Sequence, residues 1–204
     1  MGFLSSSVSV VCYQVQGKLA RPINETVAQG LKQYTIRNID NEPADKAVGW
    51  TSFEAPFAPD FSGPSFSFGT YFVFSLRVDK KSIPAKVVAK CCAQEAEKRL
   101  RQAQQKVPAK NEKKQIKEKV LHDLALRIPA TPGVFDLVWQ YEAGRLWFFS
   151  TQKGANEELE TLFVKSFSLR LVRFFPYTLA DLACDLSAPE KDALFKLSPT
   201  KFME

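Results

Sequence analysis

Positive charge is concentrated in one continuous stretch of this 204-residue chain, from Arg77 to Lys119. The stretch holds 14 lysines or arginines and 5 acidic residues, a balance of +9. The whole chain carries +6, so the residues outside the stretch sum to −3. The sequence therefore predicts a basic element on a slightly acidic body, which creates a field with a direction, rather than a uniformly basic protein.

Two helical patterns account for most of this stretch. The first helix opens at Ser82-Ile83-Pro84 and runs to about Lys106, with an apolar stripe of Val88, Cys92, Ala96, Leu100 and Ala103. The second runs from about Asn111 to Arg127 and buries Ile116, Val120, Leu121 and Leu124. At 1.5 Å per residue the first helix is roughly 35 Å long, about one turn of duplex DNA. We expect a helical hairpin over about residues 82–127.

The rest of the chain predicts an α+β fold. Alternating or β-branched apolar residues predict strands at residues 7–16, 66–78, 135–141, 145–151 and 169–174. Helical spacing predicts helices at residues 22–34 and 156–166. Prolines and glycines predict an ordered loop over residues 38–64, and residues 177–204 predict a weak helix followed by a loop. We expect mixed or antiparallel sheets with a protruding basic helical hairpin.

Composition restricts the class of protein. Apolar residues make up 45% of the sequence, enough for a core in one large domain or two small subdomains. No apolar run approaches the roughly 18 to 20 residues that cross a bilayer, and the N-terminus lacks a secretory pattern, so we expect a cytoplasmic protein without a membrane partner. The cysteines lack the paired spacing of a zinc site, and we expect small buried apolar residues at Cys12, Cys91, Cys92 and Cys184.

Five short sequence words occur in an informative order. Val48-Gly49-Trp50 precedes the strand that leads into Lys80-Lys81-Ser82-Ile83-Pro84. The two predicted helices contain Ala93-Gln94-Glu95-Ala96-Glu97-Lys98 and Lys117-Glu118-Lys119-Val120-Leu121-His122-Asp123-Leu124, and Gly144-Arg145-Leu146 ends the series. In this order the words resemble the RdgC family of bacterial recombination-associated proteins over about residues 7–180. Ile83-Pro84 and Val120-Leu121-His122 are the most specific of them.

The resemblance implies a function and an assembly. RdgC proteins bind double-stranded DNA with little sequence preference, form a ring-shaped homodimer around the duplex, associate with the nucleoid and restrain RecA-driven recombination. Older labels for the family name an exonuclease, but the resemblance favours a DNA-binding protein that is not an enzyme. Family members are longer, so we divide the chain into an RdgC-like region at residues 1–180 and a shortened C-terminal tail at residues 181–204. The chain also has Ala125-Leu126-Arg127-Ile128-Pro129 where the family commonly has Leu-Pro-Arg-Ala-Phe, which affects a dimer or DNA contact.

The basic hairpin supplies the candidate DNA-binding residues. Phosphate contacts need cations on a rigid frame, and lysines dominate here while arginine, the usual reader of guanine, is sparse. We therefore expect non-sequence-specific binding by Lys80, Lys81, Lys86, Lys90, Lys98, Arg99, Arg101, Lys113, Lys114 and Lys117. The simpler interpretation is a solvated Lys/Glu helix surface, which is what most charge runs are.

Three other functions stay open at this point. Stacking of single-stranded DNA would use Trp50, Phe53, Phe57 and Phe61, although these rings also fit packing beneath a proline-rich loop. A metal-dependent nuclease would use Glu112-Lys113-Lys114, but no partner aspartate is convincing and His122 is the only histidine. A protein-interaction module would bind an acidic partner with the basic arm. We expect no catalytic residue, metal or cofactor.

Overall fold

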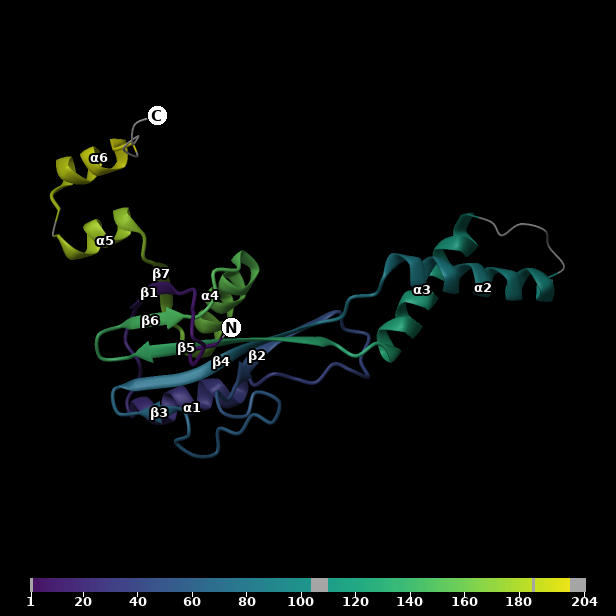
Figure 1. Cartoon of the computed structure of the whole chain (residues 1–204), viewed down its shortest axis with the longest axis horizontal. Helices are drawn as coiled ribbons and strands as arrows, with labels where there is room; N and C mark the ends of the chain where they lie inside the picture. Colours follow the sequence, from purple (N-terminus) through teal and green to yellow (C-terminus); the bar gives the residue numbers. More distant parts are fainter. Residues whose placement is uncertain (1, 104–109, 185, 199–204) are drawn as a thin grey trace.

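The fold is a curled antiparallel sheet with helices on it and a helical pair projecting from one end (Figure 1). The computed structural model describes residues 2–103, 110–184 and 186–198. The strands in this part of the chain are β1 (Val11–Gln16), β2 (Lys46–Thr51), β3 (Ser67–Phe68), β4 (Tyr71–Lys80), β5 (Thr131–Gln140), β6 (Arg145–Phe148) and β7 (Arg170–Arg173). The helices are α1 (Ile23–Gln33), α2 (Ala85–Ala103), α3 (Lys110–Arg127), α4 (Lys153–Phe167), α5 (Pro176–Ala183) and α6 (Ala188–Lys196). The expected α+β class is confirmed.

The strand order places the two longest strands side by side. The order is β2-β4-β5-β6-β1-β7, with β3 paired to β4, and every strand pair is antiparallel. Strands β4 and β5 pair along their whole length, from Tyr71 opposite Gln140 to Lys80 opposite Thr131. Residues 81–130 are therefore an insertion between paired strands, and both of its ends leave the sheet at the same point.

Aromatic side chains fill the core on one face of the sheet. Alternate residues of β4, from Phe72 to Val78, are buried as the sequence pattern predicts. Helices α1 and α4 pack against this face, and the Trp50 ring lies 5.1 Å from that of Phe74 and 5.9 Å from that of Phe167. The indole N–H of Trp50 donates a 2.7 Å hydrogen bond to the Ser166 hydroxyl. The core thus joins the sheet edge to α4.

Strand β2 lies inside the segment that the sequence predicts as a loop. Backbone pairing with β4 from Lys46 to Thr51 makes it an edge strand, and no proline falls within it. A Cβ at Gly49 would come within 2.5 Å of the Ile36 backbone, so only glycine allows the chain before β2 to lie this close. The word Val48-Gly49-Trp50 is therefore a strand with one buried aromatic and one close backbone approach.

Two further predictions need correction. The tail contains a second helix, α6, because Ser187 and Glu190 form a capping box at its start. The predicted end of the first hairpin helix, at residues 104–106, lies outside the described residues. The expected burial of the cysteines is wrong: Cys12, Cys91 and Cys92 are half-buried and Cys184 is exposed. Cys12 alternates with core residues and points to the other face of the sheet, whereas Cys91 and Cys92 lie on a helical pair too thin to bury them.

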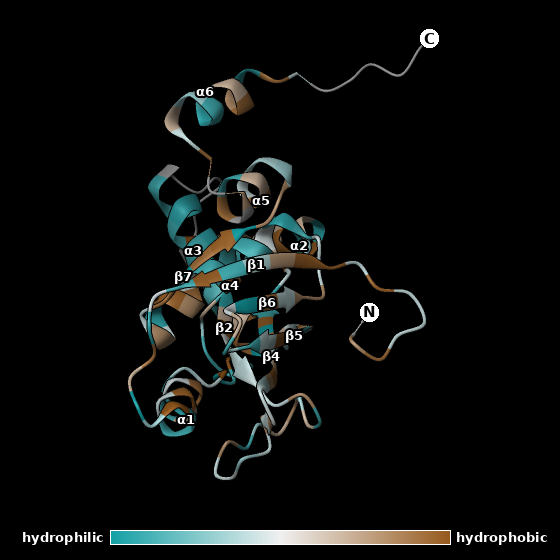
Figure 2. Ribbon diagram, turned by 90° about the vertical axis from the view of Figure 1, so that its left-hand side faces the viewer, coloured by the Kyte–Doolittle hydropathy of each residue, from teal (hydrophilic) through white to brown (hydrophobic). Residues whose placement is uncertain are grey.

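None of the helices in the described ranges combines the length and the apolar composition that crossing a bilayer requires. Figure 2 shows the same elements coloured by hydropathy. The C-terminal helices α5 and α6 lie above the sheet in this view. Several apolar side chains of these two helices are exposed, among them Leu179, Leu182 and Phe195.

Candidate nucleic-acid interface

Helices α2 and α3 form an arm that projects beyond the end of the β4–β5 ladder (Figure 1). Residues 81–84 lead out from β4 and residues 128–130 return to β5. We call these two segments the outgoing and the returning connector. The arm corresponds to the predicted hairpin over residues 82–127.

A narrow apolar seam holds the two helices of the arm together. On α2 the less exposed residues recur at helical spacing, from Val88 through Cys92 to Leu100. On α3 the buried residues of the seam are Ile116 and Val120. The seam uses one side of α2 and leaves its other sides to solvent.

An ion pair between described residues crosses the seam. The Lys119 ammonium lies 2.8 Å from a carboxylate oxygen of Glu95, whose side chain is 22% exposed, and Arg99 lies 3.7 Å from the same oxygen. The hydrogen bond from Lys119 lowers the pKa of Glu95 below its ordinary value, and the nearby positive charges of Lys119, Arg99 and Lys98 act in the same direction. This carboxylate therefore offsets part of the positive charge of the arm.

The basic residues of α2 lie mainly on the side that faces away from α3. At about 100° per residue, Lys86, Lys90 and Arg101 fall within about 60° of one another and opposite Glu95. All three are exposed. Arg101 is paired with Glu97 at 2.6 Å, whereas the side chains of Lys86, Lys90 and Lys98 form no ion pair or hydrogen bond with any described residue. Three lysine ammonium groups of α2 are therefore available to a ligand.

Helix α3 presents a second basic group. Lys113 and Lys117 are exposed and likewise have no acidic partner within the described residues. Lys114 lies 3.9 Å from Glu118, a contact between two highly exposed side chains that stabilises little. Because the α2 group faces away from α3, the predicted residues form two separate basic groups rather than one continuous surface.

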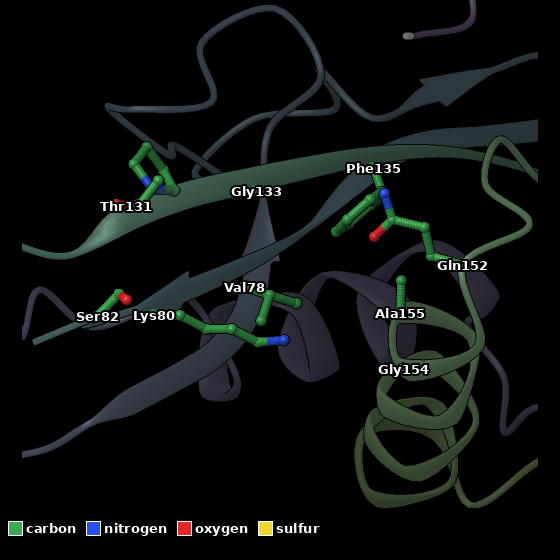
Figure 3. Close-up of a pocket in the computed structure, with 10 residues that line it drawn as sticks. Val78, Lys80, Ser82, Thr131, Gly133, Phe135, Gln152, Gly154 and Ala155 are labelled. Carbon is green, nitrogen blue, oxygen red and sulfur yellow. The ribbon is translucent and has the colours of Figure 1, made fainter. Parts of the chain in front are cut away.

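The two lysines at the end of β4 differ in environment. Lys80 is exposed, and its side chain borders a pocket of about 320 Å³ between the sheet and the start of α4 (Figure 3). Lys81 points inward, and its ammonium donates hydrogen bonds to the backbone carbonyls of Asp40, Glu42 and Ala125. Three carbonyl acceptors match the three donors of an ammonium group, so Lys81 has no donor left for a phosphate.

The four aromatic residues considered for base stacking do not form a common surface. Trp50 and Phe61 are 0% and 4% exposed and belong to the core. Phe53 packs edge to face on Phe3, with ring centroids 6.0 Å apart. Phe57 is 68% exposed, but the Arg77 guanidinium lies 5.2 Å from its ring centroid. Packing beneath and around the loop explains Trp50, Phe53 and Phe61, whereas Phe57 is exposed beside Arg77.

Sequence comparison identifies the family. The signature of the family described as "Putative exonuclease, RdgC" matches residues 9–180, well over half of the chain. The chain belongs to the RdgC family. Membership of this family supports a recombination-associated protein. No curated protein matches the sequence of this RdgC chain.

The carboxylates of this RdgC chain are dispersed. Glu112 lies in the first turn of α3, next to Lys113, and His122 is exposed on the same helix. Within residues 2–103, 110–184 and 186–198, no group of three or more His, Cys, Asp or Glu side chains is placed to hold a metal ion.

The sequence did not reveal the pocket next to Lys80. Its walls come from β4, β5 and the start of α4, so residues such as Val78, Gly133 and Ala155 meet only in the folded chain (Figure 3). Two of the residues that line the pocket, Lys80 and Ser82, belong to the motif Lys80-Lys81-Ser82-Ile83-Pro84. In this RdgC protein the pocket lies where the arm joins the body.

Proposed function

We propose that this protein binds double-stranded DNA without sequence preference, through the lysines of the arm, and acts in recombination by binding rather than by cleaving DNA. The observation that carries the proposal is the set of exposed lysines on α2 and α3 whose side chains have no carboxylate partner among the described residues: Lys86, Lys90, Lys98, Lys113 and Lys117. Lys80 extends this set to the root of the arm.

The physical basis is neutralisation of phosphates by cations on rigid helices. Each phosphate that a lysine neutralises releases condensed counterions and contributes about 0.9 to the slope of log affinity against log salt. Lysine acts as a point charge and does not read a base edge in two places as arginine does. A lysine surface therefore supports binding with little sequence preference, at about micromolar affinity in physiological salt.

The proposal includes a homodimer, as family membership suggests. One duplex cannot easily contact the outward side of α2 and the lysines of α3 of the same arm, but two arms around one duplex would each contribute a group. A duplex covered in this way is not accessible to a recombinase such as RecA. We propose this competition as the route by which the protein modulates homologous recombination on the nucleoid.

A charge-reversal pair tests the assignment. Lys113→Glu with Lys117→Glu should weaken duplex binding at least tenfold and lower the salt slope by about 1.8, because two phosphate contacts are lost. The matched control is Lys18→Glu with Lys165→Glu, the same change of charge at exposed positions of the body. Affinity is measured by mobility shift between about 50 and 200 mM salt. Equal losses in both variants, or an affinity that does not change with salt, would contradict the proposal.

A nuclease is the second candidate, because the family description names an exonuclease and Glu112-Lys113-Lys114 matches a short nuclease element. The same duplex is incubated with the protein in magnesium and in EDTA. Binding in both with intact DNA supports the proposed function. Loss of DNA in magnesium alone, abolished by Glu112→Gln, would establish the nuclease instead. Absence of both binding and cleavage would leave the basic arm as a surface for an acidic protein partner.

A further inference from the structure

The outgoing connector is fastened to a loop that belongs to the body. Lys81 follows β4 directly, and its ammonium lies 3.1 Å from the carbonyl oxygen of Asp40 and 2.7 Å from that of Glu42. Its backbone N–H donates a 2.9 Å hydrogen bond to the carbonyl of Asp45. Main chain and side chain of one residue are thus both held by residues 40–45.

The returning connector is fastened to the same loop. The side chain of Asp40 accepts a 2.9 Å hydrogen bond from the backbone N–H of Ala130, the last residue before β5. The Lys81 ammonium also reaches the carbonyl of Ala125, in the last turns of α3. Asp40 itself is held by an Asn38 side chain that accepts its N–H at 2.8 Å. Loop and both connectors therefore form one hydrogen-bonded clamp.

The clamp lies at the root of the arm, where both connectors join the body. The loop before β2 runs alongside the β4–β5 ladder to the root of the arm (Figure 1). The connectors are three and four residues long, at 128–130 and 81–84, and carry no regular structure of their own. Hydrogen bonds to these segments therefore fasten the root of the arm to the body.

We propose that Lys81, together with Asp40, is a positioning residue that sets the orientation of the DNA-binding arm. The proposal rests on the proposed function, since it assigns Lys81 a part in DNA binding without a phosphate contact. Charge-assisted hydrogen bonds to three carbonyls hold the ammonium in place, and an arm fixed in its binding orientation loses less entropy when it binds.

The neighbouring residue provides a matched control. Lys80→Met and Lys81→Met remove the same charge from adjacent positions, but the side chain of Lys80 is exposed and forms no hydrogen bond with a described residue. Ala93 of α2 and Lys165 of α4 are both exposed and can each be replaced by a ketone-bearing residue that carries a nitroxide. Pulsed electron spin resonance between the two nitroxides then reports the distance from the arm to the body. Labelled chains are diluted with unlabelled chains, so that only distances within one chain are measured, and no DNA is added.

We expect one narrow distance distribution for the wild type and for Lys80→Met, and a broadened or shifted one for Lys81→Met. An unchanged distribution in Lys81→Met overturns the proposal. The distance measurement stays valid even if the protein proves not to bind DNA. Failure of the inference and failure of the proposed function can therefore be told apart.

Duplex binding then separates positioning from contact. Lys81→Met should weaken binding several-fold with the salt slope of the wild type, whereas Lys80→Met should lower the slope by about 0.9 if Lys80 contacts a phosphate. A slope lowered by Lys81→Met with an unchanged distance distribution would make Lys81 a phosphate ligand and overturn the proposal.

A second variant covers the case in which Lys81→Met does not fold. Asp40→Ala removes the acceptor for Ala130 and leaves Lys81 in place, while it makes the chain more positive by one charge. Simple electrostatics predicts tighter DNA binding for this variant, but loss of positioning predicts weaker binding together with a broadened distance distribution. Tighter binding with an unchanged distribution overturns the proposal.

Discussion

The body and the arm of this protein are stabilised in different ways. The main hydrophobic cluster takes its buried residues from the sheet, from α1 and α4 and from the loops around them, and includes no described residue of α2 or α3. The arm buries Ile116 and Val120 in its seam and adds one ion pair between Lys119 and Glu95. A thin element of this kind has little interior, so most of its surface remains available for charge. Because the arm has few buried contacts, it opens more easily than the body.

The largest expected effect tests the body. Phe74→Ala removes a side chain that is 0% exposed and packs on Trp50 and Phe167. Loss of a buried aromatic should lower the free energy of unfolding by about 3–5 kcal/mol. Equilibrium urea unfolding, followed by the fluorescence of the core tryptophans, measures this change. A loss below about 1 kcal/mol would mean that the aromatic cluster does not stabilise the body as we describe.

The next effect tests the arm. Ile116→Ala empties a site that is 2% exposed in the seam between α2 and α3. Truncation of a buried isoleucine costs about 2–5 kcal/mol, and here the loss should fall on opening of the arm rather than on global unfolding. Hydrogen exchange should accelerate for amides of α2 and α3 while amides of β4 and β5 keep their wild-type rates.

Exposed Val87→Ala on α2 is the control for this variant, because it shortens an apolar side chain outside the seam. It should leave exchange in the arm nearly unchanged. Equal acceleration in the arm and in the sheet after Ile116→Ala would show that the two regions unfold together and would break the comparison.

Local sequence pattern predicted the elements whose stabilising contacts are regular. The alternation in residues 66–78 corresponds to β4, and the two helical stripes correspond to α2 and α3. Strand β2 was missed because an edge strand of six residues, with Gly49 and Trp50 in it, has neither a clear alternation nor a long apolar run. Only its contact with Ile36 and its pairing with β4 reveal it.

Sequence alone assigned the candidate residues to the two helices of the arm and to the end of β4 but could not divide them by environment. Lys80 and Lys81 are adjacent and chemically identical, yet one is exposed and the other binds three backbone carbonyls. Those acceptors lie about 40 residues away on either side in the chain, so no local pattern indicates them. The separation of the α2 lysines from those of α3 likewise depends on which side of each helix enters the seam.

The smallest expected effect concerns the ion pair of the arm. The pKa of Glu95 is lowered in the folded protein by the hydrogen bond from Lys119, so the pair stabilises the arm fully above the ordinary carboxyl value of about 4.3. The contribution is lost as the pH falls through the lower pKa of the folded state, because protonation removes the charge that Lys119 binds. The melting temperature of the arm helices in the wild type should therefore fall below about pH 4, as measured by thermal unfolding at a series of pH values.

Glu95→Gln isolates this contribution. The variant lacks the titrating group, so its arm should be less stable than that of the wild type at neutral pH, and the difference should vanish in acid. Hydrogen bonds from Ser62 and Ser187 lower the pKa of the Asp60 and Glu190 carboxyls as well. Both carboxyls are present in the wild type and in the variant, so their titration cancels in the difference. A difference that stays constant from neutral to acid pH would show that the pair between the helices does not stabilise the arm, and the apolar seam alone would then hold α2 on α3.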